Sequence, residues 1–305
     1  MNRRTFHRAV TGALAAMAAP LPASSAAPGA GKGGQSLQAG AVPFQLSVML
    51  WTVFRNLPFE QRLEKVAGAG YHNVELVGEY RKWTAQQFTS ADRKRRELSI
   101  TFDTTAGLAH AVGDPAAREA FLKDLRNELP IMEKLECPAV IVMSGNVVPG
   151  MPREQQHASC IEGLKRAAEV VEGKNVRLLL ENIDPKENPR YYLQSVAEGF
   201  EIIKSVGHPQ VRFLYDFYHE QIAEGNLIDK LEKNIDLVGL VHIADVPGRH
   251  EPGTGEINYG NIFKKLAELK FSHYAAMEYL PTYDAVKSLQ TEREKALMAA
   301  QTGLS

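Results

Sequence analysis

Short apolar runs alternate with longer amphipathic segments from residue 44 to the end of the chain. The short runs are typical of strands buried on both faces of a parallel sheet, whereas the longer segments repeat their apolar residues with the period of a helix. The predicted strands cover residues 45–51, 73–77, 100–104, 139–144, 177–181, 212–216, 238–243 and 274–279. The predicted helices cover residues 59–69, 84–97, 115–135, 153–172, 191–206, 219–234, 261–269 and 283–300.

This strand–helix repeat predicts an α/β fold, a (β/α)8 TIM barrel that forms a single domain over residues 44–305. The length of the segment is suitable, because such barrels usually take about 250 residues. An open doubly wound sheet is the alternative. We favour the barrel because residues 50–54, at and just after the end of the first strand, lack the glycines of a phosphate-binding turn.

The N-terminal segment does not fit this repeat. Two consecutive arginines precede a weakly apolar, alanine-rich run at residues 9–19, a pattern typical of a twin-arginine export signal. The run is too short for a stable membrane span, although a retained membrane anchor is the alternative. We expect residues 1–26 to be a signal peptide that is cut after Ala26 and residues 27–43 to be a flexible tether. The protein would then be periplasmic or secreted.

The overall charge excludes some partners. The 305 residues carry a formal net charge of -1, which argues against nucleic acid, because phosphate binding requires an excess of basic residues on one face. Two cysteines are too few for a disulfide framework, and we expect both to be buried. The oligomeric state is left open by the sequence, with a homo-oligomer as one option.

In four consecutive predicted strands, an apolar run leads into a charged or ionisable residue. In a TIM barrel, chemistry takes place at the C-terminal ends of the strands, so such residues would meet at one rim. A single carboxylate at a strand end usually caps a helix or pairs with a lysine, but three carboxylates and a histidine at equivalent positions favour a metal site. Oxygen and nitrogen ligands without a thiolate favour Mn2+, Mg2+ or Co2+. The predicted metal ligands are Glu181, Asp216, His242 and Glu278.

The chain around these residues resembles the hydroxypyruvate isomerase branch of the xylose-isomerase-like barrels. The most specific segment is IADVPGRHEPGTGEINY at residues 243–259, which is similar to the seventh loop of that family. Shorter similar segments lie at residues 181–184, 215–219 and 277–279. The resemblance covers most of the chain from about residue 44.

The resemblance implies roles for the four residues. Glu181 and Glu278 would form the catalytic acid/base pair and also bind the metal, and Asp216 and His242 would complete the metal shell. The sequence departs from the family at His242, where the isomerases often carry glutamine and the related ketose 3-epimerases carry histidine. Proton transfer between adjacent carbons of an α-hydroxycarbonyl compound requires a Lewis acid at both oxygens and a carboxylate near each carbon. Two metal-bound glutamates meet that requirement.

Three further residues are predicted to bind the substrate. His219 would begin the sixth helix and reach a substrate oxygen. Arg249 would bind a substrate carboxylate with two hydrogen bonds, which an acid such as hydroxypyruvate offers and a neutral sugar does not. Glu187 corresponds to an acid that contacts the substrate in the epimerases. Glu75, at or near the end of the second strand, is a further rim residue without an assigned role.

The sequence therefore predicts a metal-dependent isomerase that interconverts hydroxypyruvate and tartronate semialdehyde, or acts on another small hydroxycarbonyl compound. A 3-epimerase of free ketoses is the nearest alternative. An endonuclease is less favoured, because it would need several zinc ions, more histidines and a basic face. A sugar-binding protein without catalysis is the last alternative, and it would not exchange substrate protons with solvent.

Overall fold

The computed structural model describes residues 42–304. The predicted signal peptide and residues 27–41 of the predicted tether lie outside the described residues, so both stay predictions. In the described part, parallel strands form a closed barrel in chain order from β1 to β8. β1 closes the barrel by pairing with β8, with Leu46 beside Ala275. The (β/α)8 barrel expected from the alternating pattern is thereby confirmed.

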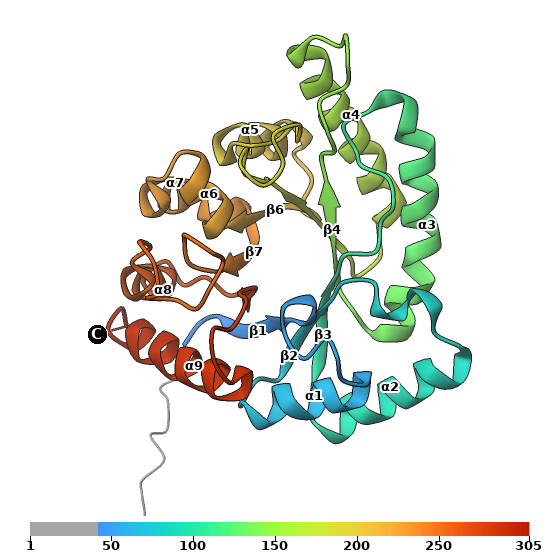
Figure 1. The fold of residues 1–305 in the computed structure, drawn as a ribbon. Coiled ribbons are helices and arrows are strands. Elements are labelled where there is room, and N and C mark those ends of the chain that lie inside the picture. The colour runs from blue at the N-terminus through green and yellow to red at the C-terminus, as the bar shows by residue number, and fades with distance from the viewer. Residues whose placement is uncertain (1–41, 305) are drawn as a thin grey trace, which may run out of the picture. The chain divides into compact units, whose positions relative to one another are not determined.

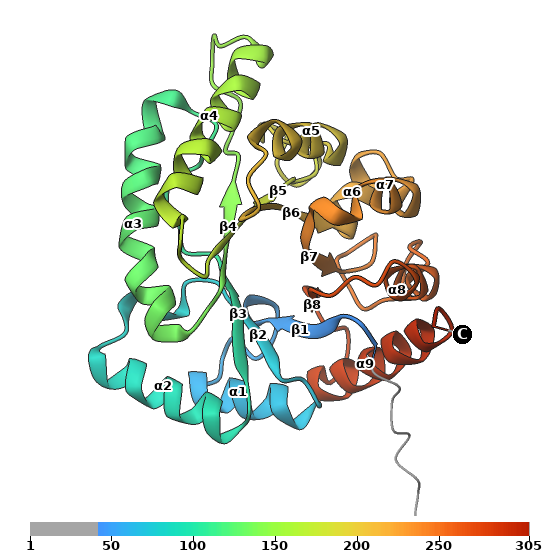
Figure 2. The same cartoon turned by 180° about the vertical axis from the view of Figure 1, so that it is seen from behind.

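The strands lie at the centre and the helices surround them, as both views of the ribbon show (Figures 1 and 2). The strands are β1 (Gln45–Met49), β2 (Asn73–Leu76), β3 (Thr101–Thr105), β4 (Ala139–Met143), β5 (Arg177–Glu181), β6 (Val211–Asp216), β7 (Val238–Ile243) and β8 (Tyr274–Met277). The helices are α1 (Phe59–Gly68), α2 (Ala85–Glu97), α3 (Arg118–Leu135), α4 (Arg153–Val171), α5 (Val196–Val206), α6 (Phe217–Ala223), α7 (Leu227–Asn234), α8 (Tyr259–Glu268) and α9 (Ala285–Gln301).

Two of the predicted helices differ from the structure. The single helix predicted for residues 219–234 is wrong, because Gly225 and Asn226 separate α6 from α7. Their φ angles of 67° and 56° are left-handed and end the helical hydrogen bonding. The predicted start at residue 191 is also wrong. α5 begins after Ser195, whose side chain caps the helix by accepting a hydrogen bond from a backbone N–H of the first turn.

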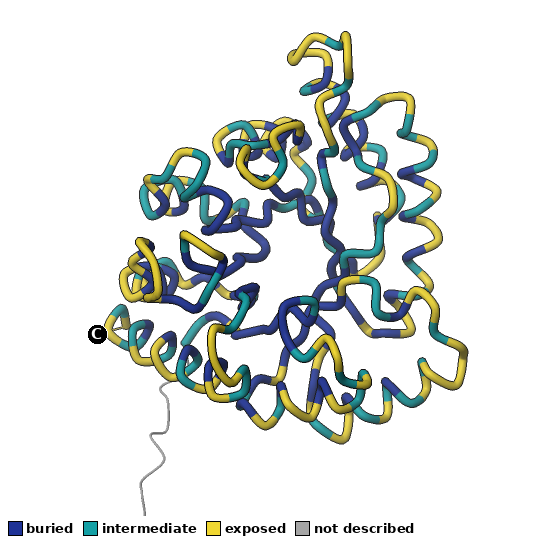
Figure 3. Tube along the Cα trace, in the orientation of Figure 1, coloured by how far each residue is buried: buried dark blue, intermediate teal, exposed yellow. Residues whose placement is uncertain are grey.

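Apolar side chains form a large layer between the strands and the helices and a small cluster inside the barrel. The tube coloured by burial shows the strands as buried and the outer faces of the helices as exposed (Figure 3). Both cysteines, Cys137 and Cys160, are buried, as expected. None of the helices in residues 42–304 is long and apolar enough to cross a membrane. The interior cluster comprises Met49, Ala139, Ile141, Leu179, Leu214, Leu240 and Ala276.

Candidate active site

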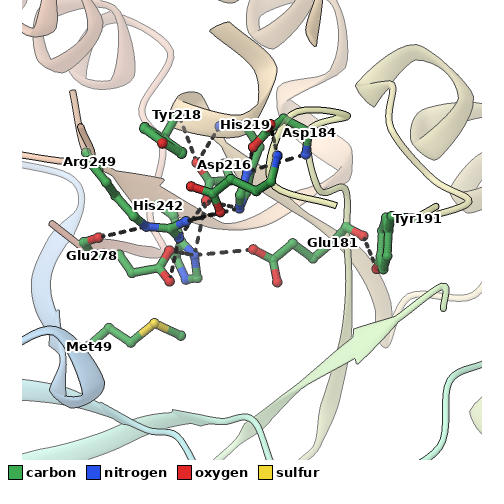
Figure 4. Close-up of polar contacts among 12 residues, drawn as sticks. Met49, Glu181, Asp184, Tyr191, Asp216, Tyr218, His219, His242, Arg249 and Glu278 are labelled. Atoms are coloured by element: carbon green, nitrogen blue, oxygen red, sulfur yellow. Dashed lines mark hydrogen bonds and ion pairs between the residues drawn. The ribbon is translucent and has the colours of Figure 1, made fainter. Parts of the chain in front are cut away.

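The four residues predicted from the strand ends lie together at the C-terminal rim of the barrel (Figure 4). One nitrogen or oxygen atom from each of them lies within 4.8 Å of the corresponding atoms of the others. All four side chains are buried, with exposed fractions between 1% and 6%. Their roles as metal ligands or as acids and bases stay predictions. We call this set the rim cluster: Glu181, Asp216, His242 and Glu278.

Strand register places two of these residues side by side. Asp216 ends β6 and pairs with His242 of β7. The Oδ1 atom of Asp216 caps α6 by accepting hydrogen bonds from the N–H groups of Tyr218, at 2.7 Å, and His219, at 3.1 Å. Because the cap uses Oδ1, the other oxygen, Oδ2, faces the rim cluster, 3.8 Å from Nδ1 of His242. The helix cap therefore decides which oxygen is available to a ligand.

The rim cluster fits a divalent cation. Among the described residues, Oδ2 of Asp216, Nδ1 of His242 and Oε2 of Glu278 are buried without a hydrogen-bond partner of acceptable geometry. Nδ1 of His242 lies 2.8 Å from Oε2 of Glu278 and 3.6 Å from Oε1 of Glu181. Buried carboxylates this close together repel one another unless a cation compensates their charge. Three carboxylates and an imidazole are a ligand set suited to Mn2+, Mg2+ or Co2+.

His242 directs its two ring nitrogens to different groups. Nδ1 faces the carboxylates of the rim cluster, whereas Nε2 lies 3.1 Å from Oε2 of Glu75, which β2 places inside the barrel. Burial alone would lower the pKa of His242, but the charges of Glu75 and Glu278 raise it well above its usual value. Glu75 therefore has a specific partner, which the sequence did not reveal.

The two glutamates of the rim cluster have different surroundings. Oε1 of Glu278 accepts a hydrogen bond from the indole N–H of Trp51, at 2.9 Å, and lies 2.7 Å from Nη2 of Arg249. Burial would raise the pKa of Glu278, but Arg249 and His242 lower it to about 2. For Glu181, burial raises the pKa, and His242 is its only side-chain partner among the described residues. Glu278 is thus held more firmly than Glu181.

Arg249 lies inside the site, where the sequence predicted a substrate-binding group. Its guanidinium carbon lies 5.5 Å from the centre of the Trp51 ring and 4.9 Å from that of Tyr218, and the residue is 8% exposed. Its Nη1 atom lies 3.2 Å from Oε2 of Glu187. Glu187, which was also predicted to contact the substrate, therefore reaches the site by pairing with Arg249. The roles of both residues in substrate binding stay predictions.

His219 also faces the rim cluster. Its Nδ1 atom lies 2.6 Å from Oδ2 of Asp184, and its Nε2 atom lies 3.5 Å from Oδ2 of Asp216. Burial would lower the pKa of His219, but the charge of Asp216 and the hydrogen bond with Asp184 raise it to about 9. This rise depends on the charge of Asp216, which a cation bound at the rim cluster would compensate. The sequence did not single out Asp184, although it lies in one of the segments that carry the family resemblance.

The loop of residues 243–259 is held by two buried carboxylates that the sequence did not single out. Glu251 accepts hydrogen bonds from Thr282 and Ser288, which tie the loop to the segment after β8. A side chain at Gly255 would place its Cβ 2.0 Å from a backbone oxygen, so only glycine fits there. This bracing holds Arg249 in place. Asp245 accepts hydrogen bonds at 2.7–3.0 Å from the backbone N–H groups of Val246, Gly253, Gly255 and Ile257.

Comparisons with known proteins agree with the fold. Residues 63–299 match the family model described as xylose isomerase-like TIM barrel. The chain is 31% identical to a 2-oxo-tetronate isomerase from Pectobacterium atrosepticum, over 75% of this chain and 89% of the relative. It is 28% identical to a hydroxypyruvate isomerase from Escherichia coli, over 78% of this chain and 93% of the relative.

A solved structure titled AP endonuclease, family 2, from Brucella melitensis superposes with a TM-score of 0.75 at 24% identity. The match covers 83% of this chain and 99% of the other, and it shows a shared fold alone. The family model and the named relatives both extend over most of the barrel. The chain therefore belongs to the xylose isomerase-like TIM barrel family, in the group that includes hydroxypyruvate and 2-oxo-tetronate isomerases.

Proposed function

We propose that this protein is a metal-dependent isomerase that interconverts hydroxypyruvate and tartronate semialdehyde, or two isomers of a closely related small hydroxycarbonyl acid. The names of its relatives support an isomerase of this class. The observation that carries the proposal is the convergence of three carboxylates and one imidazole at the rim of the barrel. In this reaction a proton leaves one carbon, a proton is delivered to the neighbouring carbon, and the hydroxyl proton passes from one oxygen to the other.

The four side chains of the rim cluster would hold a divalent cation. A bound cation supplies a Lewis acid that stabilises negative charge on the two substrate oxygens. Glu181 and Glu278 are the carboxylates that we assign to proton transfer at the two carbons. Asp216 and His242 have no such task, because Asp216 is fixed as the cap of α6 and His242 is fixed by its bond to Glu75.

The substrate is proposed to be an acid because a buried guanidinium faces the site. Arg249 lies between two aromatic rings and 2.7 Å from Oε1 of Glu278, where it can form charge-assisted hydrogen bonds with a substrate carboxylate. His219, oriented by the 2.6 Å contact between its Nδ1 and Asp184, would form a hydrogen bond with a substrate oxygen. Glu187 would keep Arg249 oriented and contact the substrate beside it.

A 3-epimerase of free ketoses is the second candidate. The observation that favours it is the histidine at position 242, which resembles the epimerases at a position where the isomerases often carry glutamine. The two functions differ in the charge of the substrate and in the carbon that loses its proton.

Incubation with Mn2+ in D2O tests the proposal. Purified protein would be mixed separately with hydroxypyruvate and with neutral ketoses, and deuterium at each carbon would be measured by NMR. We expect deuterium to enter the hydroxymethyl carbon of hydroxypyruvate while tartronate semialdehyde is formed. Deuterium at carbon 3 of a ketose alone would favour the epimerase. Exchange with no compound would leave a binding protein and overturn the proposal.

A further inference from the structure

A carboxylate lies deep inside the barrel with a single partner. Glu75 is fully buried, and among the described residues its only side-chain hydrogen bond is the 3.1 Å contact between its Oε2 and Nε2 of His242. The two residues come from β2 and β7, so the bond crosses the interior of the barrel. Burying a carboxylate with one partner is costly for the stability of the fold, so the contact between Glu75 and His242 calls for a functional explanation.

The backbone around Glu75 is also irregular. The register between β2 and β3 shifts at this point, so that Val74 pairs with Phe102 but Glu75 pairs with Thr104. The extra residue on β3 is Asp103. Bulges of this kind redirect side chains and are frequent next to active sites. The shift therefore coincides with the one position of β2 whose carboxylate reaches the rim cluster.

The contact decides which nitrogen of His242 is free. A carboxylate accepts hydrogen bonds, so Nε2 carries the proton that it shares with Glu75. In the neutral ring Nδ1 then has the lone pair, and Nδ1 is the atom that faces Glu278 at 2.8 Å and Glu181 at 3.6 Å. A hydrogen bond of this kind orients a histidine ligand and increases its basicity.

We propose that Glu75 is a positioning residue of the metal centre: it accepts the Nε2–H of His242 and so presents Nδ1 as the ligand atom. This inference rests on the proposed metal site. Glu75 does not touch the cation or the substrate, so its effect falls on metal affinity. Loss of such a partner typically weakens metal binding by about 10- to 100-fold.

Metal titration of purified full-length protein tests this assignment. Glu75→Met keeps a side chain of similar length and removes the acceptor, and we expect the affinity of this variant for Mn2+ to fall by about 10- to 100-fold. Asp103→Leu is the matched control, because Asp103 is an equally buried carboxylate whose Oδ2 instead accepts from Ser47 at 2.5 Å. Its affinity for Mn2+ should stay at the wild-type value. Thermal unfolding of the metal-free variants shows whether each is folded.

A second measurement needs no variant. With Zn2+ as a diamagnetic probe, 15N NMR of the wild-type protein should find the proton of the His242 ring on Nε2 and the metal on Nδ1. Metal on Nε2, or equal losses of affinity in Glu75→Met and Asp103→Leu, would overturn the inference. An unchanged affinity in Glu75→Met would overturn it too, while the metal centre itself stands. A wild-type protein that binds no Mn2+ would instead overturn the proposed function.

Discussion

Replacing Glu181 with glutamine separates proton transfer from metal binding. The carboxylate of Glu181 has no side-chain partner other than His242 among the described residues, so a glutamine there can turn its amide oxygen toward the cation. Glu278 lacks this freedom. Trp51 and Arg249 both donate to Oε1 of Glu278, so they would hold the amide oxygen of a glutamine and leave its NH2 group facing the cluster.

We therefore expect Glu181→Gln to keep most of its affinity for Mn2+ and to lose turnover. Removal of a proton-transfer group lowers kcat by about 10²- to 10⁴-fold, which corresponds to about 3–5 kcal/mol in the activation barrier. Calorimetric titration gives the Mn2+ affinity. Steady-state rates of hydroxypyruvate isomerisation, measured up to saturating Mn2+, show whether excess metal restores kcat.

Asp216→Asn is the control for the loss of a ligand alone. Its amide oxygen can still accept the capping hydrogen bonds from Tyr218 and His219, which turns the NH2 group toward the metal position. Mn2+ binding should weaken by more than the about 10- to 100-fold that loss of a partner outside the metal shell causes, and excess Mn2+ should recover much of the activity. If saturating Mn2+ restores Glu181→Gln and Asp216→Asn equally, the reasoning is refuted, and the proton is carried by another group, with His219 the next candidate.

Three other changes have expected outcomes. Arg249→Met should raise the KM for hydroxypyruvate by about 100-fold, which corresponds to the loss of about 3 kcal/mol of charge-assisted hydrogen bonding. The KM for a neutral ketose should rise much less. If steady-state assays show equal increases in KM for both substrates, Arg249 does not bind a substrate carboxylate. Burial raises the pKa of Glu220 to about 7 despite its ion pair with a lysine, so the folded state binds this proton more tightly than the unfolded state. This proton contributes about 3 kcal/mol to the free energy of unfolding below pH 4.5, and the contribution is lost as pH rises through 7. Glu220→Gln should remove this pH dependence when urea unfolding is measured across pH. An unchanged pH profile in Glu220→Gln would contradict the assignment to Glu220. Changing Arg3 and Arg4 to lysine should block export, as measured by cell fractionation. The mature wild-type protein should begin after Ala26, and an exported protein that keeps its first residue would contradict cleavage at that position.

The barrel could be predicted because strands buried on both faces leave continuous apolar runs. The break between α6 and α7 could not. Gly225 and Asn226 lower helix propensity without forbidding a helix, and the left-handed angles that separate the two helices depend on how each packs. The start of α5 was missed for a similar reason. Ser195 can cap the helix only because its own backbone is extended, and the sequence does not show that conformation.

The rim cluster could be predicted because each member ends an apolar run or directly follows one, and parallel strands end at one rim. Its partners could not be predicted in this way. Trp51 and Glu278 are 227 positions apart in the sequence, and their hydrogen bond exists because the closed barrel brings β1 beside β8. The signal available for Glu75 was similar to that for the cluster, a charged residue near the end of an apolar run. Its partner His242 lies across the barrel and leaves no trace in the local pattern.

The pairing of β1 with β8 sets a condition on synthesis of the protein. β1 leaves the ribosome near the beginning of translation, but one of its edges has no strand to pair with until β8 follows near the end. An unpaired strand edge is prone to aggregation in a nascent chain. Glu278 comes directly after β8, so the last member of the rim cluster arrives together with the strand that closes the barrel. A chain that stops before β8 therefore lacks both the closed sheet and the last member of the rim cluster.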